Sequence, residues 1–375
     1  DDVARARHLI ATGAPVYASL APSWVSEFPG VTPERMAATL EALGFAGASE
    51  TALGAQAVSA EAARRLREQG PGITISSACP AAVAFIARFL PKYRTALTPV
   101  ASPALAHARM IRQWFGAKAS TVFIGPCIAK KLEADHHPDE LALALTFEEL
   151  HRWLAETNVA PDTVAREGRF VPHAAEEGVI YPVEGGMNAT VEAQGAGDGT
   201  EFITLAGIRH IDDTLGGYEP CAADRRVFIE CLACKGGCVR GPAMTRERMS
   251  IDAILRVRRA AATGLTPPKR DIPVSMEMAR PAHAPRSVRI DDVRVRAALR
   301  RIGKTRPEDE QNCGGCGYDT CRAFARALLE GEVDGGRGVR ERAHGDRIDA
   351  CLGVLADVGE RDPARLERQG HEAAD

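Results

Sequence analysis

The sequence lacks three features that would point to nucleic acid, a membrane or secretion. Its formal net charge is −3, so it has no basic excess with which to bind a phosphate backbone. No stretch of apolar residues approaches the length that crosses a bilayer, which predicts no membrane span. It has no signal peptide and no initiating methionine, because the chain begins with DDVARARHLI. We therefore expect a cytoplasmic protein, and we leave open whether further sequence precedes Asp1.

Disulfide bonds are not expected either, although the chain has ten cysteines. Disulfide frameworks suit small secreted domains without a core, whereas this chain has 375 residues and is 45% hydrophobic. Most of the cysteines lie in tight loop motifs or beside Gly or Pro, where backbone amides can point at sulfur. Clustered thiolates favour metal, and they select zinc, copper or iron–sulfur clusters.

The first part of the chain alternates helical and strand patterns. TPERMAATLEALGF (32–45) and AEAARRLREQG (60–70) predict helices, the first behind a Thr-Pro start and the second ending at glycine. GITIS (72–76) predicts a strand, and it runs into SACPAAVAFIARFL. The same order of strand, cysteine and loop returns at STVFIGPCIAKKLEA and RRVFIECLACKGGC. Three strand-to-loop junctions thus each deliver a cysteine, at the place where open α/β sheets build their sites.

Composition divides the chain into a large first domain and a small second one. Residues 263–287 are rich in proline and lack periodicity, which predicts a linker after a first domain over 1–262. A compact cluster-binding module is expected over 288–358, with a helix at DDVRVRAALRRIG. The polar residues 359–375 predict a disordered tail.

The second domain has its own cysteine motif, NCGGCGYDTC, which places Cys313, Cys316 and Cys321 in a glycine-bearing turn before a helix. Three cysteines among crowded amides favour a 4Fe–4S cluster, and the helix N-terminus favours its negative charge. Cys351 is the expected fourth ligand, with His344 a weaker substitute and a zinc site the alternative. The stretch resembles the small 4Fe–4S domain of membrane electron-transfer subunits and redox sensors, although the gap to Cys351 is long.

The first domain carries three motifs, SSACPAAV, GPCIAKKLE and ECLACKGGCVRGP, that resemble in order those of the iron-only hydrogenase large subunit. The resemblance implies a two-lobed α/β H-cluster domain with mixed sheets flanked by helices, beside the small, mainly helical 4Fe–4S domain. It also implies two cofactors. One is an H-cluster, in which a 4Fe–4S cubane is bridged to a di-iron centre with CO and CN ligands. The other is an additional 4Fe–4S cluster.

The family's ligand set carries over by motif. The resemblance assigns the cubane to Cys79, Cys127, Cys234 and Cys238. By the same resemblance, Cys238 would be the bridge to the di-iron centre. We expect Cys234 and Cys238 to lie one helical turn apart and to face the cubane, while Gly236 and Gly237 allow metal and backbone to approach closely.

Other residues receive roles from the same resemblance. Lys130 matches a lysine that donates a hydrogen bond to a cyanide of the distal iron, and a solvated helix lysine is the alternative. Glu133 matches the motif's acidic residue and is expected to orient the lysine. Ser102 matches a serine of the family's proton relay. Cys221 and Cys231 lie outside the ligand set and are expected to be buried structural thiols.

The chain departs from the turnover enzymes of the family at several positions. Their relay cysteine is Ala78 in this chain, and because alanine carries no proton we expect turnover lower by about 10²–10⁴-fold. Glu61 is the candidate relay carboxylate, with a solvated glutamate as the alternative. The family's pocket methionines are Gly125 and Leu232, and its first-motif tryptophan is Ala82.

These features imply an iron-only hydrogenase of the branch regarded as sensory or regulatory. It would bind H₂ and slowly interconvert it with protons and electrons, and the electrons would leave through the C-terminal cluster. The expected partners are a redox partner protein or signalling domain and the hydrogenase maturation proteins. The alternative is a non-catalytic iron–sulfur protein, for electron transfer or cluster assembly, without the di-iron centre.

Overall fold

The computed structural model describes residues 1–196, 199–216, 225–245, 251–261, 270–278, 290–312 and 318–330. Contacts divide the chain into two units, residues 1–284 and 285–375. The boundary falls within the stretch that the sequence predicts to be a linker. No helix in the described ranges combines the length and apolar character needed to cross a membrane.

The first unit contains two sheets of parallel strands. The first sheet has the order β2-β1-β4-β5, and the second has the order β3-β7-β6. The strands are β1 (Val16–Leu20), β2 (Gly47–Glu50), β3 (Gly72–Ile75), β4 (Ser120–Gly125), β5 (Leu143–Thr146), β6 (Thr200–Ala206) and β7 (Arg226–Leu232).

The α/β class is confirmed, but the strand pairing is simpler than the expected mixed sheets. Every pairing between the named strands is parallel. The antiparallel pairing found among the described residues is an isolated bridge between Val100 and Glu277. Parallel pairing follows from the alternation of strands and helices, because parallel neighbours need crossover connections.

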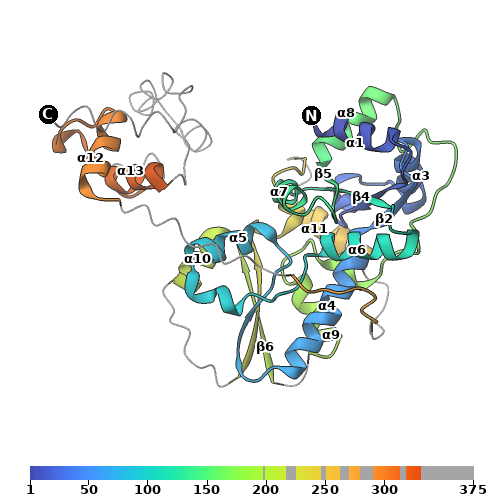
Figure 1. The fold of residues 1–375 in the computed structure, drawn as a ribbon, viewed down its shortest axis with the longest axis horizontal. Coiled ribbons are helices and arrows are strands. Elements are labelled where there is room, and N and C mark those ends of the chain that lie inside the picture. Colours follow the sequence, from blue (N-terminus) through green and yellow to red (C-terminus); the bar gives the residue numbers. More distant parts are fainter. Residues whose placement is uncertain are drawn as a thin grey trace. The chain divides into compact units, whose positions relative to one another are not determined.

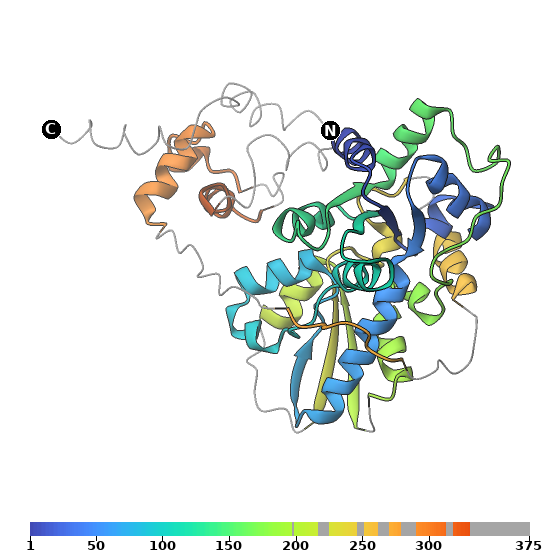
Figure 2. The same ribbon diagram turned by 45° about the vertical axis from the view of Figure 1, so that its right-hand side comes forward.

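Helices flank both sheets (Figure 1). In the first unit they are α1 (Asp2–Ala11), α2 (Trp24–Glu27), α3 (Pro33–Ala42), α4 (Thr51–Glu68), α5 (Pro80–Phe89), η1 (Pro91–Ala96), α6 (Pro103–Phe115), α7 (Ala129–His136), α8 (Phe147–Thr157), η2 (Glu177–Ile180), α9 (Gly186–Ala193), α10 (Ile208–Gly216), η3 (Cys238–Arg240) and α11 (Ile251–Ala260). Figures 1 and 2 show α5 and α10 on one side of the second sheet, with α4 and α9 on the other.

The predicted helices form, with one difference in length. Thr32 caps α3, because its side chain accepts a hydrogen bond from the Arg35 N–H, as the Thr-Pro start predicts. Helix α4 begins at Thr51 and not at Ala60. Residues 51–63 are all buried. The first turns of α4 therefore lack the polar face by which an amphipathic helix is recognised in a sequence.

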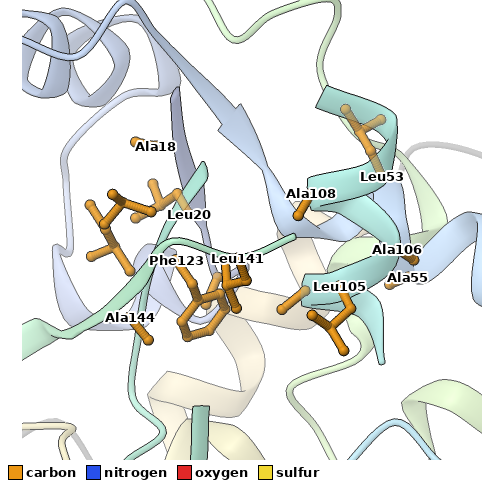
Figure 3. Close-up of a cluster of buried hydrophobic side chains, with 14 of the residues drawn as sticks. Ala18, Leu20, Leu53, Ala55, Leu105, Ala106, Ala108, Phe123, Leu141 and Ala144 are labelled. Atoms are coloured by element: carbon orange, nitrogen blue, oxygen red, sulfur yellow. The ribbon is translucent and has the colours of Figure 1, made fainter. Parts of the chain in front are cut away.

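Helices α4 and α6 cross closely at Gly54. A Cβ added at Gly54 would lie 2.8 Å from the backbone nitrogen of His107 and closer still to the carbonyl oxygen of Pro103. Leu53 of α4 and Leu105 of α6 both belong to the main core, which also contains Phe123 of β4 (Figure 3). A separate core around the second sheet gives the unit its two lobes, and it includes Ile75, Ile86, Tyr93, Ile229 and Cys231.

Residues 270–278 are packed within the first unit, although they fall within the predicted linker. Met276 is buried, and its carbonyl oxygen accepts a hydrogen bond of 2.8 Å from the Ala101 N–H. Arg270 forms a 2.6 Å ion pair with Glu177. This part of the predicted linker is therefore a packed strap, and we call residues 270–278 the strap below.

The second unit is small and helical in its described part. It contains α12 (Asp292–Arg301), η5 (Pro307–Asp309) and α13 (Cys321–Glu330). Asp291 caps α12 by accepting a 2.8 Å hydrogen bond from the Arg294 N–H. Val295 and Leu299 of α12 pack with Phe324 of α13 in a core of their own. The unit therefore has an apolar centre independent of the first unit.

We expect Gly54→Ala to destabilise the first unit by about 3 kcal/mol, because overpacking at a tight helix crossing is strongly unfavourable. Tryptophan fluorescence during denaturation reports this unit, since all three tryptophans lie in it. Gly70→Ala is the matched control, because a Cβ at Gly70 would meet no atom within 4 Å. Equal denaturation midpoints for the two variants would contradict the close crossing.

Candidate metal centre

A cavity of about 100 Å³ lies where four strands of the first unit end. Its walls come from the loops after β1, β3, β4 and β7, together with parts of α4, α6 and α9. The strands belong to two sheets, so the cavity lies between the two lobes. This is the carboxyl-end position at which open α/β sheets place their ligands.

Three predicted ligand cysteines line the cavity. Cys79 is the N-cap residue of α5, Cys127 follows β4, and Cys238 begins η3. The fourth, Cys234, lies close to the others. Burial, and then the thiols of Cys79 and Cys127, raises the pKa of Cys234 to about 11. The three strand-to-loop junctions therefore bring four thiols to one site.

The electrostatics of the thiols favours a positively charged metal group. Burial raises the pKa of Cys238 well above its ordinary value, and the thiols of Cys127, Cys79 and Cys234 raise it further. Burial also raises the pKa of Cys127, which the charge of Lys130 opposes. Without metal these thiols stay protonated at neutral pH, whereas thiolate ligation requires them to lose that proton.

The arrangement suits a cluster better than a single ion. Across the ranges that the structure describes, no three His, Cys, Asp or Glu side chains are grouped closely enough to hold one metal ion. A zinc site needs its thiolates around one atom, whereas each thiolate of a 4Fe–4S cluster binds a different iron. The four cysteines of the first unit are the number of thiolates that a 4Fe–4S cubane requires.

The loop that carries Cys234 and Cys238 corrects one prediction. It is a turn, and not the helical turn expected, because Gly236 and Gly237 have φ values of +85° and +88°. Gly237 donates its N–H to the Cys234 carbonyl at 3.0 Å. A Cβ at Gly237 would also lie 3.0 Å from the backbone nitrogen of Glu184. The glycine pair is thus required by both positive φ and close backbone approach.

Cys231 does not belong to this set of thiols. It lies in β7, is fully buried, and its N–H donates to Ser76 Oγ at 3.2 Å. Burial raises the pKa of Cys231 to about 12. It is a buried structural thiol, as predicted. Cys221, for which the same was expected, lies outside the described residues.

Lys130, Ser102 and Glu133 meet beside the cavity in a triangle of hydrogen bonds. Lys130 Nζ donates to Ser102 Oγ at 2.8 Å and to Glu133 Oε2 at 2.6 Å. Ser102 Oγ in turn donates to Glu133 Oε2 at 2.9 Å. Lys130 is only 7% exposed and lines the cavity, so it is not the solvated helix lysine of the alternative. An ammonium has three donors, which leaves one for an anionic group in the cavity.

Ser23 is a cavity residue that sequence reasoning missed. Its side chain is fully buried, lines the cavity, and its Oγ has no hydrogen-bond partner within the described part of the chain. A buried hydroxyl without a partner is unfavourable, which points to a partner in the cavity itself. The available signal was VYASLAPS, a fourth strand-to-loop junction that carries serine where the others carry cysteine.

Glu230 was also missed. It lies in β7, is buried and lines the cavity. Its carboxylate accepts hydrogen bonds from the Met187 N–H at 3.2 Å and from Thr204 Oγ1 at 3.3 Å. Burial nevertheless raises the pKa of Glu230 to about 7. The cavity wall therefore includes a carboxyl group that titrates near neutral pH.

The structure does not connect Ala78 and Glu61, two of the positions that the sequence analysis assigns to the proton relay. Ala78 lines the cavity beside Cys79. Glu61 is 4% exposed and not solvated, and its carboxylate accepts hydrogen bonds from Arg64 at 2.7 Å and Arg65 at 2.6 Å. Burial alone would raise the pKa of Glu61, but these hydrogen bonds hold it below its ordinary value. Among the described contacts, none links the Glu61 carboxylate to Ser102 or to the cavity.

Comparison with protein families decides where the chain belongs. Residues 14–242 match the model of the iron-only hydrogenase large subunit, C-terminal domain. The chain belongs to the iron-only hydrogenase large-subunit family. Residues 310–336 match a second model, described as an Fe-S cluster. Iron–sulfur cofactors are thus supported in both units.

Solved structures of [FeFe]-hydrogenases share the fold. One, from work on oxygen inactivation of the H cluster, is 19% identical with a TM-score of 0.55, covering 70% of this chain and 89% of its own. A variant of HydA1 from Chlamydomonas reinhardtii is 20% identical with a TM-score of 0.55, covering 71% and 89%. HydA(deltaEFG), a structure that concerns stepwise H-cluster assembly, is 20% identical with a TM-score of 0.54 and the same coverage. No curated protein matches the chain.

The cavity wall is altered at the positions where the sequence analysis places the family's pocket residues. A side chain at Gly125 would meet the Phe123 ring at 2.6 Å and Ala21 Cβ at 2.7 Å, so that position has no room for a methionine. Leu232 lines the cavity, whereas Ala82 of α5 is buried in the core around the second sheet. At Gly125 and Leu232, where the resemblance predicts methionines, the chain therefore has no thioether. This changes the surroundings of any bound metal.

The cysteines of the second unit are only partly described. Cys321 begins α13, and its N–H donates to Asn312 Oδ1 at 2.8 Å. Cys313, Cys316, Cys351 and His344 lie outside the described residues. The matched segment 310–336 contains Cys313, Cys316 and Cys321 but ends before Cys351. A 4Fe–4S cluster with Cys351 as its fourth ligand remains a prediction.

We expect Cys127→Ala and Cys234→Ala each to remove the iron and sulfide of one cluster, because each would leave a cubane with three protein thiolates. Iron and acid-labile sulfide per chain measure the loss. Cys231→Ala is the control, since Cys231 lies in the core of β7. Full iron content in the two ligand variants would rule out this ligand set.

Proposed function

We propose that the protein binds H₂ at an H-cluster and interconverts it slowly with protons and electrons, and that it serves as a hydrogen or redox sensor. The observation that carries this proposal is the set of groups around one cavity. A cubane alone needs only cysteines. Lys130, held by two hydrogen bonds, and the Ser23 hydroxyl, which has no partner in the described part of the chain, are donors beyond that need. They suit the anionic cyanide ligands of a di-iron centre.

Different residues of the chain would hold different parts of the cofactor. Cys79, Cys127 and Cys234 would hold the cubane, and Cys238 would bridge it to the di-iron centre. When bound, the di-iron centre supplies the metal at which H₂ is split or formed. Ser102 and Glu133 fix the ammonium of Lys130, so that its remaining N–H is oriented before any ligand arrives. The apolar wall around the cavity limits the access of water.

Slow turnover follows from how protons are supplied to the cavity. Ala78 has no group that can pass a proton to the di-iron centre. Ser102 is bonded to Lys130 and Glu133, and Glu61 is held by two arginines. The relay implied by the family resemblance is thus interrupted at Ala78 and again before Glu61. A site that binds H₂ but turns it over slowly suits detection better than production.

Electrons would leave through a 4Fe–4S cluster in the second unit, which the Fe-S cluster match at residues 310–336 supports. From there a redox partner protein or a signalling domain would receive them. Insertion of the di-iron centre requires hydrogenase maturation proteins, and the assembly described for HydA(deltaEFG) supports that requirement. We propose that the protein acts in the cytoplasm, where its clustered thiols stay reduced.

The deciding experiment is infrared spectroscopy of anaerobically purified protein made together with maturation proteins. We expect bands in the metal carbonyl and cyanide stretching region that shift under H₂. The control is protein made without maturation proteins, which should show iron–sulfur absorption and no such bands. Absence of the bands from fully matured protein would favour the alternative, a non-catalytic iron–sulfur protein.

Ala78→Cys tests the missing relay. We expect it to raise H₂ turnover of the matured protein by about 10²–10⁴-fold, the usual contribution of a positioned proton-transfer group. The matched control is Ala78→Val, which adds bulk at the same position without a titratable proton. Equal turnover in the two variants would show that proton delivery at residue 78 does not limit the rate.

A further inference from the structure

Three buried hydroxyl groups form a hydrogen-bonded chain behind the cavity. Tyr181 Oη lies 2.6 Å from Ser59 Oγ, and Ser59 Oγ lies 2.7 Å from Thr190 Oγ1. Ser59 is fully buried within α4, Thr190 is buried in α9, and Tyr181 follows η2. Packing alone does not explain three hydroxyls in a core, because phenyl, methyl and isopropyl groups would fill the same space without polar atoms.

The two ends of this series of hydroxyl groups lie at two different cavities of the protein surface and interior. Tyr181 lines the cysteine-lined cavity, together with Ala78 and Glu230. Thr190 lines a separate cleft, together with Glu177 and Glu184. The pKa of Tyr181 is raised, chiefly by burial and further by the charges of Glu230 and Glu177. The phenol thus lies within electrostatic reach of one carboxyl group on each side.

Hydroxyl groups have the chemistry that a proton path needs. Each one donates and accepts at the same time, so a proton can enter at one end while another leaves at the far end. No hydroxyl becomes charged overall, and no bond to carbon forms or breaks. The last member, Thr190, donates to the Met187 carbonyl at 2.8 Å in the resting arrangement. When a proton moves along the three hydroxyl groups, the Thr190 hydroxyl would rotate away from the Met187 carbonyl and donate to water in the cleft.

We propose that Tyr181, Ser59 and Thr190 form a proton path between the cysteine-lined cavity and the cleft beside α9, which supplies the protons that Ala78 cannot. Glu230, on the cavity wall, is the carboxyl group that exchanges protons with the Tyr181 end. This inference rests on the proposed function, since the protons are those of H₂ interconversion. It assigns to this chain a route that does not pass through Ser102 or Glu61.

The first test uses Thr190→Val, which keeps the shape of the side chain and removes its hydroxyl. In matured protein we expect the rate at which H₂ exchanges isotope with D₂O to fall at least tenfold. The carbonyl and cyanide bands should keep their positions, because Thr190 is not on the cavity wall. Thr190→Ser, which restores a hydroxyl, should recover most of the rate.

The matched control is Thr39→Val. Thr39 is also buried in a helix, and its Oγ1 donates to the Arg35 carbonyl at 2.6 Å, remote from both spaces. Equal exchange rates in Thr190→Val and Thr39→Val would overturn the path. So would failure of Thr190→Ser to recover the rate while tryptophan fluorescence shows native folding.

A second test does not depend on the H-cluster. In protein that carries ζ-¹³C tyrosine, the isotope shift of that carbon reports how fast the Tyr181 hydroxyl exchanges with D₂O. Tyr181→Phe assigns the signal, and Tyr93, which is also buried, is the internal comparison. We expect Thr190→Val to slow exchange at Tyr181 at least tenfold and to leave Tyr93 unchanged. Unchanged exchange at Tyr181 would overturn the path.

The two tests separate the failure of this inference from that of the proposed function. If matured protein shows no carbonyl or cyanide bands, the hydrogenase proposal fails, and hydroxyl exchange alone decides whether the path exists. If the bands are present and Thr190→Val has no effect on either measurement, the hydrogenase proposal stands and the path does not.

Discussion

The site depends on parallel strands of two sheets that end at one place. Strands β1 and β4 of the first sheet and β3 and β7 of the second all have their carboxyl ends at the same cavity. Each of these strands is followed by a short loop that carries at least one polar or sulfur-bearing side chain to the site, and the loop after β7 carries both Cys234 and Cys238. Because strand register fixes where each loop begins, the relative positions of the thiols follow from backbone pairing. The cysteines themselves then need only a turn, such as the one at Gly236 and Gly237, to face inward.

Burial makes this cavity unfavourable without a cofactor. It lowers the acidity of the thiols, leaves the Ser23 hydroxyl without a partner among the described residues, and raises the pKa of the Glu230 carboxyl. Each of these groups loses hydration without full compensation from the described residues. A charged cluster would supply the missing partners to several of them together. The protein therefore holds in advance the polar groups that its cofactor requires, at the expense of its stability when empty.

The sequence predicted those features that depend on the spacing of neighbouring residues. The three junctions, the cap of α3, the helix α12 and the neighbourhood of Lys130 and Glu133 could all be inferred from short motifs. It could not predict contacts between distant segments, such as the hydroxyl pair of Ser59 and Thr190, because these residues are 131 positions apart and no local spacing relates them. It misplaced the start of α4, since a helix buried on all sides has no amphipathic period. It also took the strap for a linker, because proline-rich extended chain looks the same whether it is packed or free.

The strap has a consequence for what counts as one cooperative folding unit. The family match ends at residue 242, yet Met276 fills a place in the main core, and Arg270 pairs with Glu177 beside the cleft. The strap bonds to Ala101, the residue before Ser102, and so it supports the backbone next to the lysine triangle. The segment that matches the family model is therefore shorter than the segment that packs as one unit. A fragment cut at the homology boundary would contain the four predicted cubane cysteines and Lys130, but would lack Met276, which belongs to the main core.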